Sequence, residues 1–133
     1  MLCIDTSTMI AFLEGEQGKD VDLVDQALQD QVGVFSPVVI TELLSDPKLP
    51  RSVREILLEI PVLPIMQGFW ERAGLLRAKL VRRNHKAKLA DTLIAQTCLD
   101  HQIPLVTRDN DFTHFTKVSA LKVYVEPSPT GRH

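Results

Sequence analysis

The stretch that decides the fold is Lys88-Leu89-Ala90-Asp91-Thr92-Leu93-Ile94-Ala95, in which one carboxylate opens an otherwise apolar helix. A buried charge destabilises a protein unless another group compensates for it. The free N–H groups and the dipole of a helix N-terminus compensate in part, and a metal ion would do so far more strongly. We therefore take Asp91 as the centre of a candidate site and look for acids that the fold can bring to it.

The composition is that of an ordinary globular domain. The chain has 133 residues, of which 44% are apolar and 24% are charged, and its formal net charge is −2. This length suits one domain with a hydrophobic core, so we expect a single domain at residues 1–126 and a flexible tail at 127–133. The weak negative charge argues against general attraction to nucleic acid but permits a local basic patch.

Cysteine usage and hydropathy indicate where the protein works. Cys3 and Cys98 lie in apolar segments without a pairing pattern, so we expect two buried thiols in a reducing compartment. No apolar run reaches membrane-spanning length, and the strand-like start at residues 2–5 does not resemble a secretory signal. These observations predict a cytoplasmic protein with no membrane partner.

Short apolar runs alternate with helical patterns along the chain. The runs predict strands at 2–4, 34–35, 62–65, 105–106 and 122–125. The patterns predict helices near 6–13, 20–30, 37–45, 50–59, 69–80 and 89–101, and one helical turn at 112–115. Thr6, Ser7 and Thr8 offer N-caps for the first helix, and Ser36-Pro37 is a typical helix start. The alternation predicts an α/β fold: a three-layer α/β/α domain with a mainly parallel central sheet.

Three further acids stand where such a sheet can bring them to Asp91. Asp5 and Asp109 each follow an apolar strand, and Glu42 lies in the helix after the strand at 34–35. In open parallel sheets, sites form outside the carboxyl ends of the strands. We therefore predict a four-carboxylate cluster that holds a hard divalent cation, Mg²⁺ or Mn²⁺. No Cys/His spacing suggests structural zinc.

Each acid also has a simpler interpretation when it is taken alone. A single Asp after a strand is usually a helix cap, a Glu in a helix is usually solvated, and Asp109 and Asp111 are typical turn formers. The four acids together, each next to apolar sequence, favour a site. The remaining acids are interpreted as surface charges; they include Asp20, Asp22, Asp25, Asp46 and Asp100.

Four motifs in order resemble the PIN-domain family. They are LCIDTS at 2–7, TELL at 41–44, LADTLIA at 89–95 and PLVTRDNDF at 104–112. The set is similar to that of the VapC-like toxin ribonucleases of type II toxin–antitoxin pairs, and the resemblance covers nearly the whole chain. It implies a parallel sheet between helices and a metal-dependent endoribonuclease that hydrolyses RNA phosphodiester bonds.

The resemblance also implies roles for individual residues. The catalytic acids map onto Asp5, Glu42, Asp91 and Asp109, with Asp5, Asp91 and Asp109 as metal ligands and Asp111 as a possible further ligand. Ser7 and Thr107 match polar positions that support the acids. The implied partners are an RNA substrate, a cognate antitoxin protein and a second copy of the chain in a homodimer.

A basic connector, residues 82–88, lies just before Asp91. Its cations could grip RNA phosphates beside the acids, and a solvated loop is an equally good interpretation; they are Arg82, Arg83, Lys86 and Lys88. His85 is interpreted as an exposed loop residue, and Phe69 and Trp70 are expected to pack in the core.

Two other classes of function stay open. An aspartate-nucleophile phosphatase would use Asp5, but such enzymes commonly carry a second Asp two positions on, where this chain has Ser7. The other alternative is a non-catalytic or RNA-processing PIN-fold module outside any toxin–antitoxin pair. The intact acidic set argues against a non-catalytic module, because clustered like charges cost stability when no cation lies among them.

Overall fold

Four short parallel strands form the centre of the molecule, which a computed structural model describes for residues 1–126. The strands are β1 (Leu2–Ile4), β2 (Gly33–Val34), β3 (Leu105–Thr107) and β4 (Val123–Val125), in the spatial order β2-β1-β3-β4. All three strand pairings are parallel. The predicted α/β fold and parallel sheet are confirmed, and the tail predicted at 127–133 lies outside the described residues.

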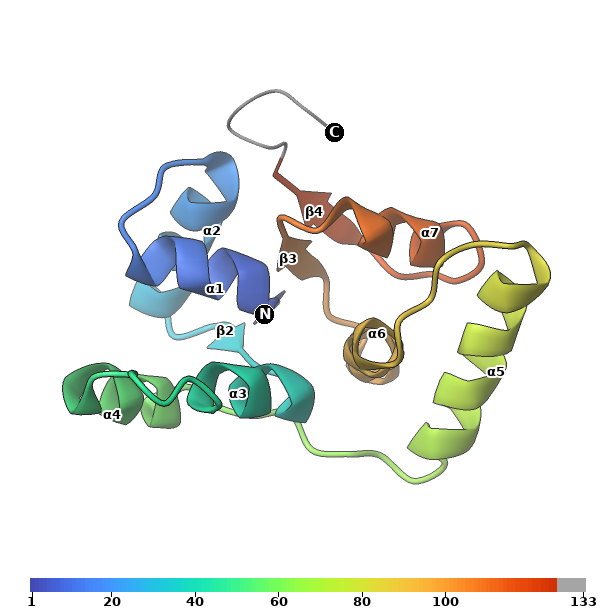
Figure 1. Ribbon diagram of the computed structural model, residues 1–133, viewed down its shortest axis with the longest axis horizontal. Coiled ribbons are helices and arrows are strands. Elements are labelled where there is room, and N and C mark those ends of the chain that lie inside the picture. The colour runs from blue at the N-terminus through green and yellow to red at the C-terminus, as the bar shows by residue number, and fades with distance from the viewer. Residues whose placement is uncertain (127–133) are drawn as a thin grey trace.

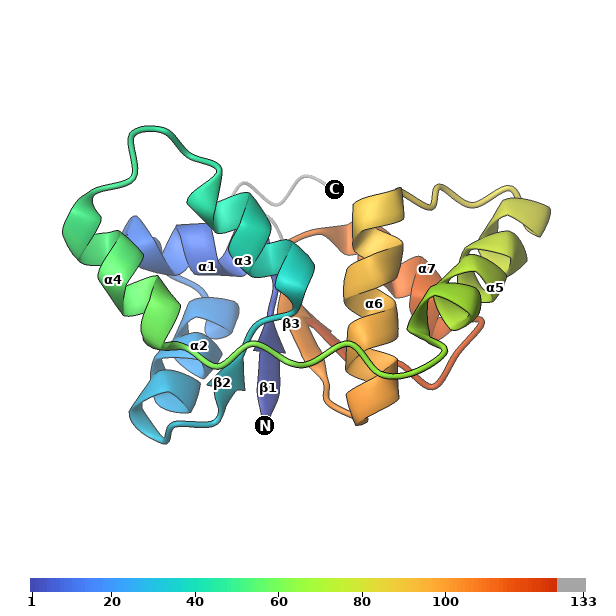
Figure 2. The same ribbon diagram turned by 90° about the horizontal axis from the view of Figure 1, so that it is seen from below.

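The helices are α1 (Thr6–Leu13), α2 (Lys19–Gln29), α3 (Pro37–Leu44), α4 (Arg51–Glu59), α5 (Phe69–Arg82), α6 (Leu89–His101) and α7 (Thr113–Thr116), with a short 3-10 turn, η1 (Asn110–Phe112), before α7. Figure 1 shows α1 and α2 on one side of the sheet and α5, α6 and α7 on the other. Figure 2 gives the same arrangement after a turn of 90°. The predicted three layers are therefore present. None of the helices within residues 1–126 combines the length and apolar character needed to cross a membrane.

The two central strands, β1 and β3, are buried because helices cover both faces of the sheet. Cys3, Ile4, Leu105 and Val106 have no exposed surface, which explains why the two central strands are continuous apolar runs rather than alternating patterns. Cys3 and Cys98 are buried free thiols, as predicted.

A short extended segment adds an edge beyond β2. The Phe35 N–H donates to the Pro61 carbonyl at 2.9 Å, and the Leu63 N–H donates to the Phe35 carbonyl at 2.8 Å. The bridge between Phe35 and Val62 is parallel. The strand predicted at 62–65 is therefore present only as an isolated bridge.

Two predicted helix starts have different outcomes. Ser36 caps α3 as expected, because its Oγ accepts from the Val39 N–H at 3.2 Å. The caps predicted for α1 are wrong: Asp5 occupies the N-cap position, without a side-chain cap bond. The hydroxyls of residues 6–8 instead donate to acids; their acceptors are Glu42, Asp5 and Asp20.

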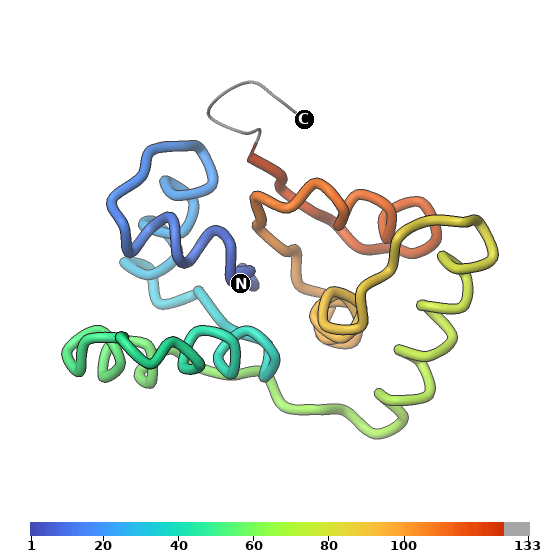
Figure 3. Tube along the Cα trace, viewed as in Figure 1, coloured from blue at the N-terminus to red at the C-terminus, as the bar shows by residue number. Residues whose placement is uncertain are grey.

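The order of the strands creates a switch point between β1 and β3. In Figure 3 the chain builds β2 on one side of β1, then crosses after α4 to the far side of the molecule. Helices α5 and α6 follow, and β3 pairs with the other side of β1. Sites in open parallel sheets form at such a point, outside the carboxyl ends of the strands. Asp5 follows β1 there, and Asp109 lies just past β3.

Candidate active site

Asp5 is held rigidly at the end of β1. Its side chain is buried, and the Ser7 and Thr107 hydroxyls both donate to its Oδ2, at 2.7 and 2.8 Å. Burial raises the pKa of Asp5, and these hydrogen bonds oppose that rise. These two hydrogen bonds fix the orientation of the carboxylate. Its other oxygen, Oδ1, receives no side-chain hydrogen bond from residues 1–126. The structure thus brings both predicted supporting residues to Asp5.

The loop after β3 is tied to the same hydroxyls. The Asp109 N–H donates to Thr107 Oγ1 at 2.9 Å, and the Arg108 N–H donates to Ser7 Oγ at 3.0 Å. The Asp111 N–H donates to Asp109 Oδ1 at 2.9 Å, so Asp109 caps the short η1 turn. Asp109 therefore has a defined position next to the end of β3.

Asp91 lies in the first turn of α6 and is half-buried. Burial, followed by the charges of Asp109 and Asp5, raises the pKa of Asp91 from 3.8 to about 6, and Asp111 adds a smaller effect. Asp109, Asp5 and Asp111 thus lie near enough to Asp91 for their charges to act on it. We call Asp5, Asp91, Asp109 and Asp111 the aspartate cluster.

Glu42 lies at the border of the aspartate cluster. It is exposed on α3, and its Oε1 accepts from the Thr6 hydroxyl at 2.6 Å. Because Thr6 directly follows Asp5, this bond places Glu42 beside the end of β1. Helix α3 contacts both α1 and α6, which explains how an exposed helix residue reaches the site.

The chemistry of these side chains suits a hard divalent cation. Carboxylate oxygens are the ligands that such ions prefer. The raised pKa of Asp91 reflects its burial and, after that, the nearby charges of Asp109 and Asp5, and a cation would offset both effects. As the side chains stand, residues 1–126 contain no group of three His, Cys, Asp or Glu arranged to hold a metal ion. The charge and the oxygen atoms of the aspartate cluster therefore suit a divalent cation, whereas the present side-chain orientations do not form a complete ligand shell.

An ion pair that the sequence did not reveal lies behind the loop of Asp109. Asp20, predicted to be a surface charge, is 2% exposed. Arg108 Nε donates to Asp20 Oδ2 at 2.7 Å and Arg108 Nη2 to Oδ1 at 3.1 Å. Arg108 also pairs with Glu16 at 2.9 Å and donates to the Gln17 carbonyl at 2.7 Å. The prediction for Asp20 is wrong because an arginine 88 positions away in the sequence reaches it.

Gly18 makes room for this ion pair. A Cβ atom at position 18 would lie 2.5 Å from Asp20 Oδ1 and 2.9 Å from Arg108 Nη2. Both distances are too short for a side chain, so only glycine lets the backbone pass so near the pair.

The family of the chain follows from a comparison with known proteins. The family model of the PIN domain matches residues 2–118. The chain belongs to the PIN domain family. A search of curated proteins gave no match.

Solved structures have the same fold as this PIN domain. VapBC2 from Rickettsia felis, bound to a DNA fragment from its promoter, has a TM-score of 0.72 at 16% identity, covering 93% of this chain and 97% of that chain. DNA-bound VapBC from Salmonella typhimurium has a TM-score of 0.72 at 16% identity, with 93% and 96% covered. VapBC-5 from Mycobacterium tuberculosis, a member of the VapBC family of toxin-antitoxin systems, has a TM-score of 0.65 at 17% identity, with 92% and 96% covered. At these identities the likeness establishes the shared fold.

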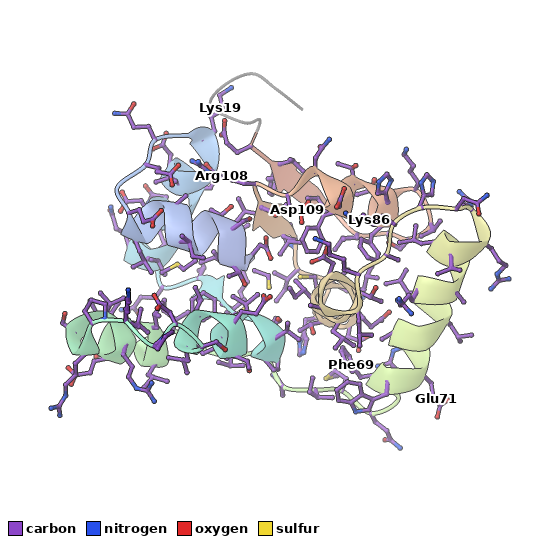
Figure 4. All side chains as sticks on the ribbon, in the orientation of Figure 1. Lys19, Phe69, Glu71, Lys86, Arg108 and Asp109 are labelled. Atoms are coloured by element: carbon purple, nitrogen blue, oxygen red, sulfur yellow. The ribbon has the colours of Figure 1, made fainter. Side chains whose placement is uncertain are left out.

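The predicted RNA-binding cations of the PIN domain divide into two groups. Arg82 and Arg83, at the end of α5, line a pocket of about 460 Å³ together with Lys79, Lys117 and Val118. We call this the basic pocket. Lys86 and Lys88 lie exposed on the basic connector, outside that pocket. Figure 4 shows Lys86 near Asp109 in projection.

Sequence reasoning missed two members of the basic pocket. Lys79 stands three and four positions before Arg82 and Arg83, a spacing that places them on one side of a helix, so a helical pattern could have found it. Lys117 comes from the C-cap of α7, and no local signal connects it with α5.

Two expectations about the aromatic and histidine residues need correction. Trp70 is 65% exposed and packs edge-on against the buried Phe69 at 4.9 Å, rather than in the core. His85 is half-buried and stacks on His114 of α7, with ring centroids 4.5 Å apart. The stack explains why His85 is less exposed than a free loop residue.

Asp100 is also more than a surface charge. Arg72 Nη2 and Nε donate to its two carboxylate oxygens at 2.7 and 2.9 Å, and the Asp100 side chain is only 7% exposed. The pair joins α5 to α6. It therefore helps to fix α6, which carries Asp91 at its other end.

Proposed function

We propose that this PIN domain is a Mg²⁺-dependent endoribonuclease, with Mn²⁺ able to substitute, and the toxin of a type II toxin–antitoxin pair. The observation that carries the proposal is the aspartate cluster: carboxylates from β1, α6 and the loop after β3 meet at the switch point of the sheet. Burial of Asp91, followed by repulsion from Asp109 and Asp5, raises its pKa to about 6. Such a cost is typical of a site that binds cations.

Asp5, Asp91 and Asp109 are the residues proposed to hold the ion, with Asp111 as a further oxygen donor. A bound divalent cation supplies Lewis-acid activation of the phosphodiester and of water, and it stabilises the leaving oxygen. Ser7 and Thr107 keep the Asp5 carboxylate in one orientation, and Asp91 or Asp109 orients the attacking water. Glu42 contributes a further carboxylate at the border. We assign no separate general base.

The toxin assignment is supported by the names of the structural neighbours, which include members of toxin–antitoxin systems. We propose a cognate antitoxin as the protein partner, a homodimer as the assembly and the cytoplasm as the location. The antitoxin would place a basic side chain against the aspartate cluster, because that cluster is a concentrated negative charge. Inhibition would then follow from both charge and blockage.

Cleavage of RNA by the purified protein tests the enzymatic part of the proposal. We expect discrete fragments from structured RNA in Mg²⁺ or Mn²⁺ and none in EDTA. Asp91→Asn and Asp109→Asn should each lower the rate at least about a hundredfold, because each removes charge that holds the ion. Asp22→Asn, an exposed position on α2, is the matched control and should keep full activity.

The same assay separates the alternatives. Intact RNA in both metals, with the protein folded, would favour a non-catalytic module. Hydrolysis of a phosphomonoester, lost in Asp5→Asn, would favour the phosphatase. RNA cleavage without growth arrest on expression of the chain alone would support an RNA-processing enzyme outside any toxin–antitoxin pair.

A further inference from the structure

The basic pocket gathers cations from two separate parts of the chain. Lys79, Arg82 and Arg83 come from the end of α5, and Lys117 comes from the C-cap of α7. The pocket has a volume of about 460 Å³ and one apolar lining residue, Val118. Its lining is thus almost entirely cationic, in a chain whose net charge is −2.

No acid within residues 1–126 neutralises these cations. The ion pairs of that part of the chain involve Arg51, Arg72 and Arg108, and none of the four pocket cations. Like charges that are brought together without a partner repel one another. Their arrangement therefore favours an anionic ligand from outside the chain.

Part of the arrangement of these cations has a purely structural explanation. Cations stabilise the C-terminus of a helix by interacting with its dipole, typically by a few tenths of a kcal/mol to about 1 kcal/mol each. Lys79 and Arg82 lie in the last turn of α5, so this effect accounts for part of the pattern. The dipole of α5 does not explain why Lys117, from α7, lies in the same pocket.

The basic connector runs from the basic pocket to the aspartate cluster. Arg83 lines the pocket. Lys88, at the other end of the connector, is near enough to Asp91 for its positive charge to lower the pKa of Asp91, opposing the burial and the acids that raise it. Five peptide steps separate the two residues, a span of roughly 18 Å at most. The stack of His85 on His114 ties the connector to α7 between these points. The pocket and the cluster are therefore joined by a short, anchored and basic segment.

We propose that the basic pocket binds a backbone phosphate of the RNA substrate, a few nucleotides away from the phosphate that is cleaved. This inference rests on the proposed function, because it takes RNA as the ligand of the aspartate cluster. A phosphate group is a small anion that several Lys and Arg side chains recognise together. The strand would follow the basic connector, with Lys86 and Lys88 facing intermediate phosphates. Recognition of this kind depends on the spacing of the phosphates and does not distinguish one base sequence from another.

Binding of RNA oligonucleotides of two lengths tests the proposal. The pocket variant combines Lys79→Gln, Arg82→Gln, Arg83→Gln and Lys117→Gln. The control variant makes the same change of charge at exposed positions elsewhere; it combines Lys19→Gln, Lys48→Gln, Arg54→Gln and Lys122→Gln. Each set is introduced together with Asp91→Asn, so that the RNA stays intact during the titration.

We expect the pocket variant to bind a single-stranded 12-nucleotide RNA at least about tenfold more weakly than its parent. The magnitude of the slope of log K against log salt should fall by about 0.7, because the variant loses its contact with one phosphate of a single strand. A dinucleotide, too short to span both sites, should show a smaller loss of affinity than the 12-nucleotide RNA. The control variant should match its parent with both RNAs. Inorganic phosphate should shift NMR signals of the pocket in the parent and not in the pocket variant.

Three outcomes would overturn the proposal. Equal loss of affinity in the pocket and control variants would show a general effect of net charge. An unchanged salt slope with a lower melting temperature would show that the cations serve only the helix ends. Loss of antitoxin binding with unchanged RNA binding would assign the pocket to an acidic segment of a protein. Each outcome leaves cleavage by the unmodified protein as a separate test of the proposed function.

Discussion

At the scale of single residues, burial and neighbouring acids make the charged form of Asp91 unfavourable. Its pKa is about 6 in the folded protein and 3.8 as an ordinary carboxyl. Between these values the folded state binds more protons than the unfolded state, so the free energy of unfolding falls as pH rises from about 4 to about 6. The loss is fully present at neutral pH. A divalent cation that binds among the carboxylates would remove much of it.

We therefore predict that Asp91→Asn stabilises the metal-free protein at pH 7. The gain should be about 1–2 kcal/mol, below the full value of the pKa difference because Asp91 is half-buried and partly screened by solvent. Denaturant unfolding in EDTA at pH 4.5 and pH 7 measures it. Between pH 4.5 and pH 7, the free energy of unfolding of the unmodified protein should fall relative to that of the variant. A variant of equal or lower stability at pH 7 would contradict the electrostatic account.

Metal addition gives the complementary measurement on the same two proteins. Mg²⁺ should raise the melting temperature of the unmodified protein and have a smaller effect on Asp91→Asn, because an ion that binds only the folded state stabilises it. Asp22→Asn is the control and should respond as the unmodified protein does. Equal melting temperatures in EDTA and in excess Mg²⁺ would count against a cation site in the cluster.

At the scale of elements, the pair of Arg108 and Asp20 joins the loop after β3 to the start of α2. Arg108 stands between Thr107, which donates to Asp5, and Asp109. Its guanidinium is held by Asp20, Glu16 and the Gln17 carbonyl, while its backbone N–H donates to Ser7. The segment that orients two acids is therefore fixed by a nearly buried ion pair on the far side of the loop.

We predict that Asp20→Asn lowers the free energy of unfolding by about 2–3 kcal/mol. Removing one partner leaves Arg108 largely uncompensated, and the cost stays below that of a fully buried pair because Glu16 still faces the guanidinium. Asp22→Asn, on the exposed side of α2, should change stability by less than about 0.5 kcal/mol. Chemical denaturation of the three proteins checks the prediction, and equal midpoints for Asp20→Asn and Asp22→Asn would refute it.

At the scale of the whole molecule, α4 and α5 both present exposed apolar side chains. Of the apolar residues on α2 and α4, Val24 and Leu57 are buried, whereas Ile56 is 53% exposed and lines a pocket of about 450 Å³ between the two helices. On α5, Trp70 and Leu75 are 65% and 64% exposed. Exposed apolar patches mark contact surfaces more often than chance. We propose that the concave pocket receives a segment of the antitoxin and that α5 contacts a second copy of the chain.

We predict that the two surfaces can be disrupted separately. Ile56→Glu should abolish co-purification of the protein encoded by the neighbouring gene and leave the size of the free protein unchanged. Leu75→Glu should turn a dimer into a monomer and leave the co-purification intact, so each variant is the control for the other. Size-exclusion chromatography with light scattering measures both. A monomeric unmodified protein with no co-purifying partner would contradict the toxin assignment and leave the fold unaffected.

The sequence alone determined the fold and the chain positions of the acids. Apolar runs at strands and helical spacing between them are local patterns, and a chain that alternates them can bury its strands only in a parallel sheet covered on both faces. Once the sheet is parallel, Asp5 and Asp109 must lie at the same edge, because each follows a strand. Asp91 could be placed beside them, since its helix leads into β3.

Only the tertiary structure decided which distant side chains meet. Asp20 resembled its exposed neighbours Asp22 and Asp25 in sequence, yet it is buried because Arg108 reaches it across 88 positions. The hydroxyls of α1 looked like helix caps, but they donate to the carboxylates of Asp5, Asp20 and Glu42. Lys117 joins the basic pocket only through the packing of α7 against the rest of the fold. Local patterns record which face of an element is apolar, whereas polar contacts depend on the relative placement of elements, which long-range packing sets.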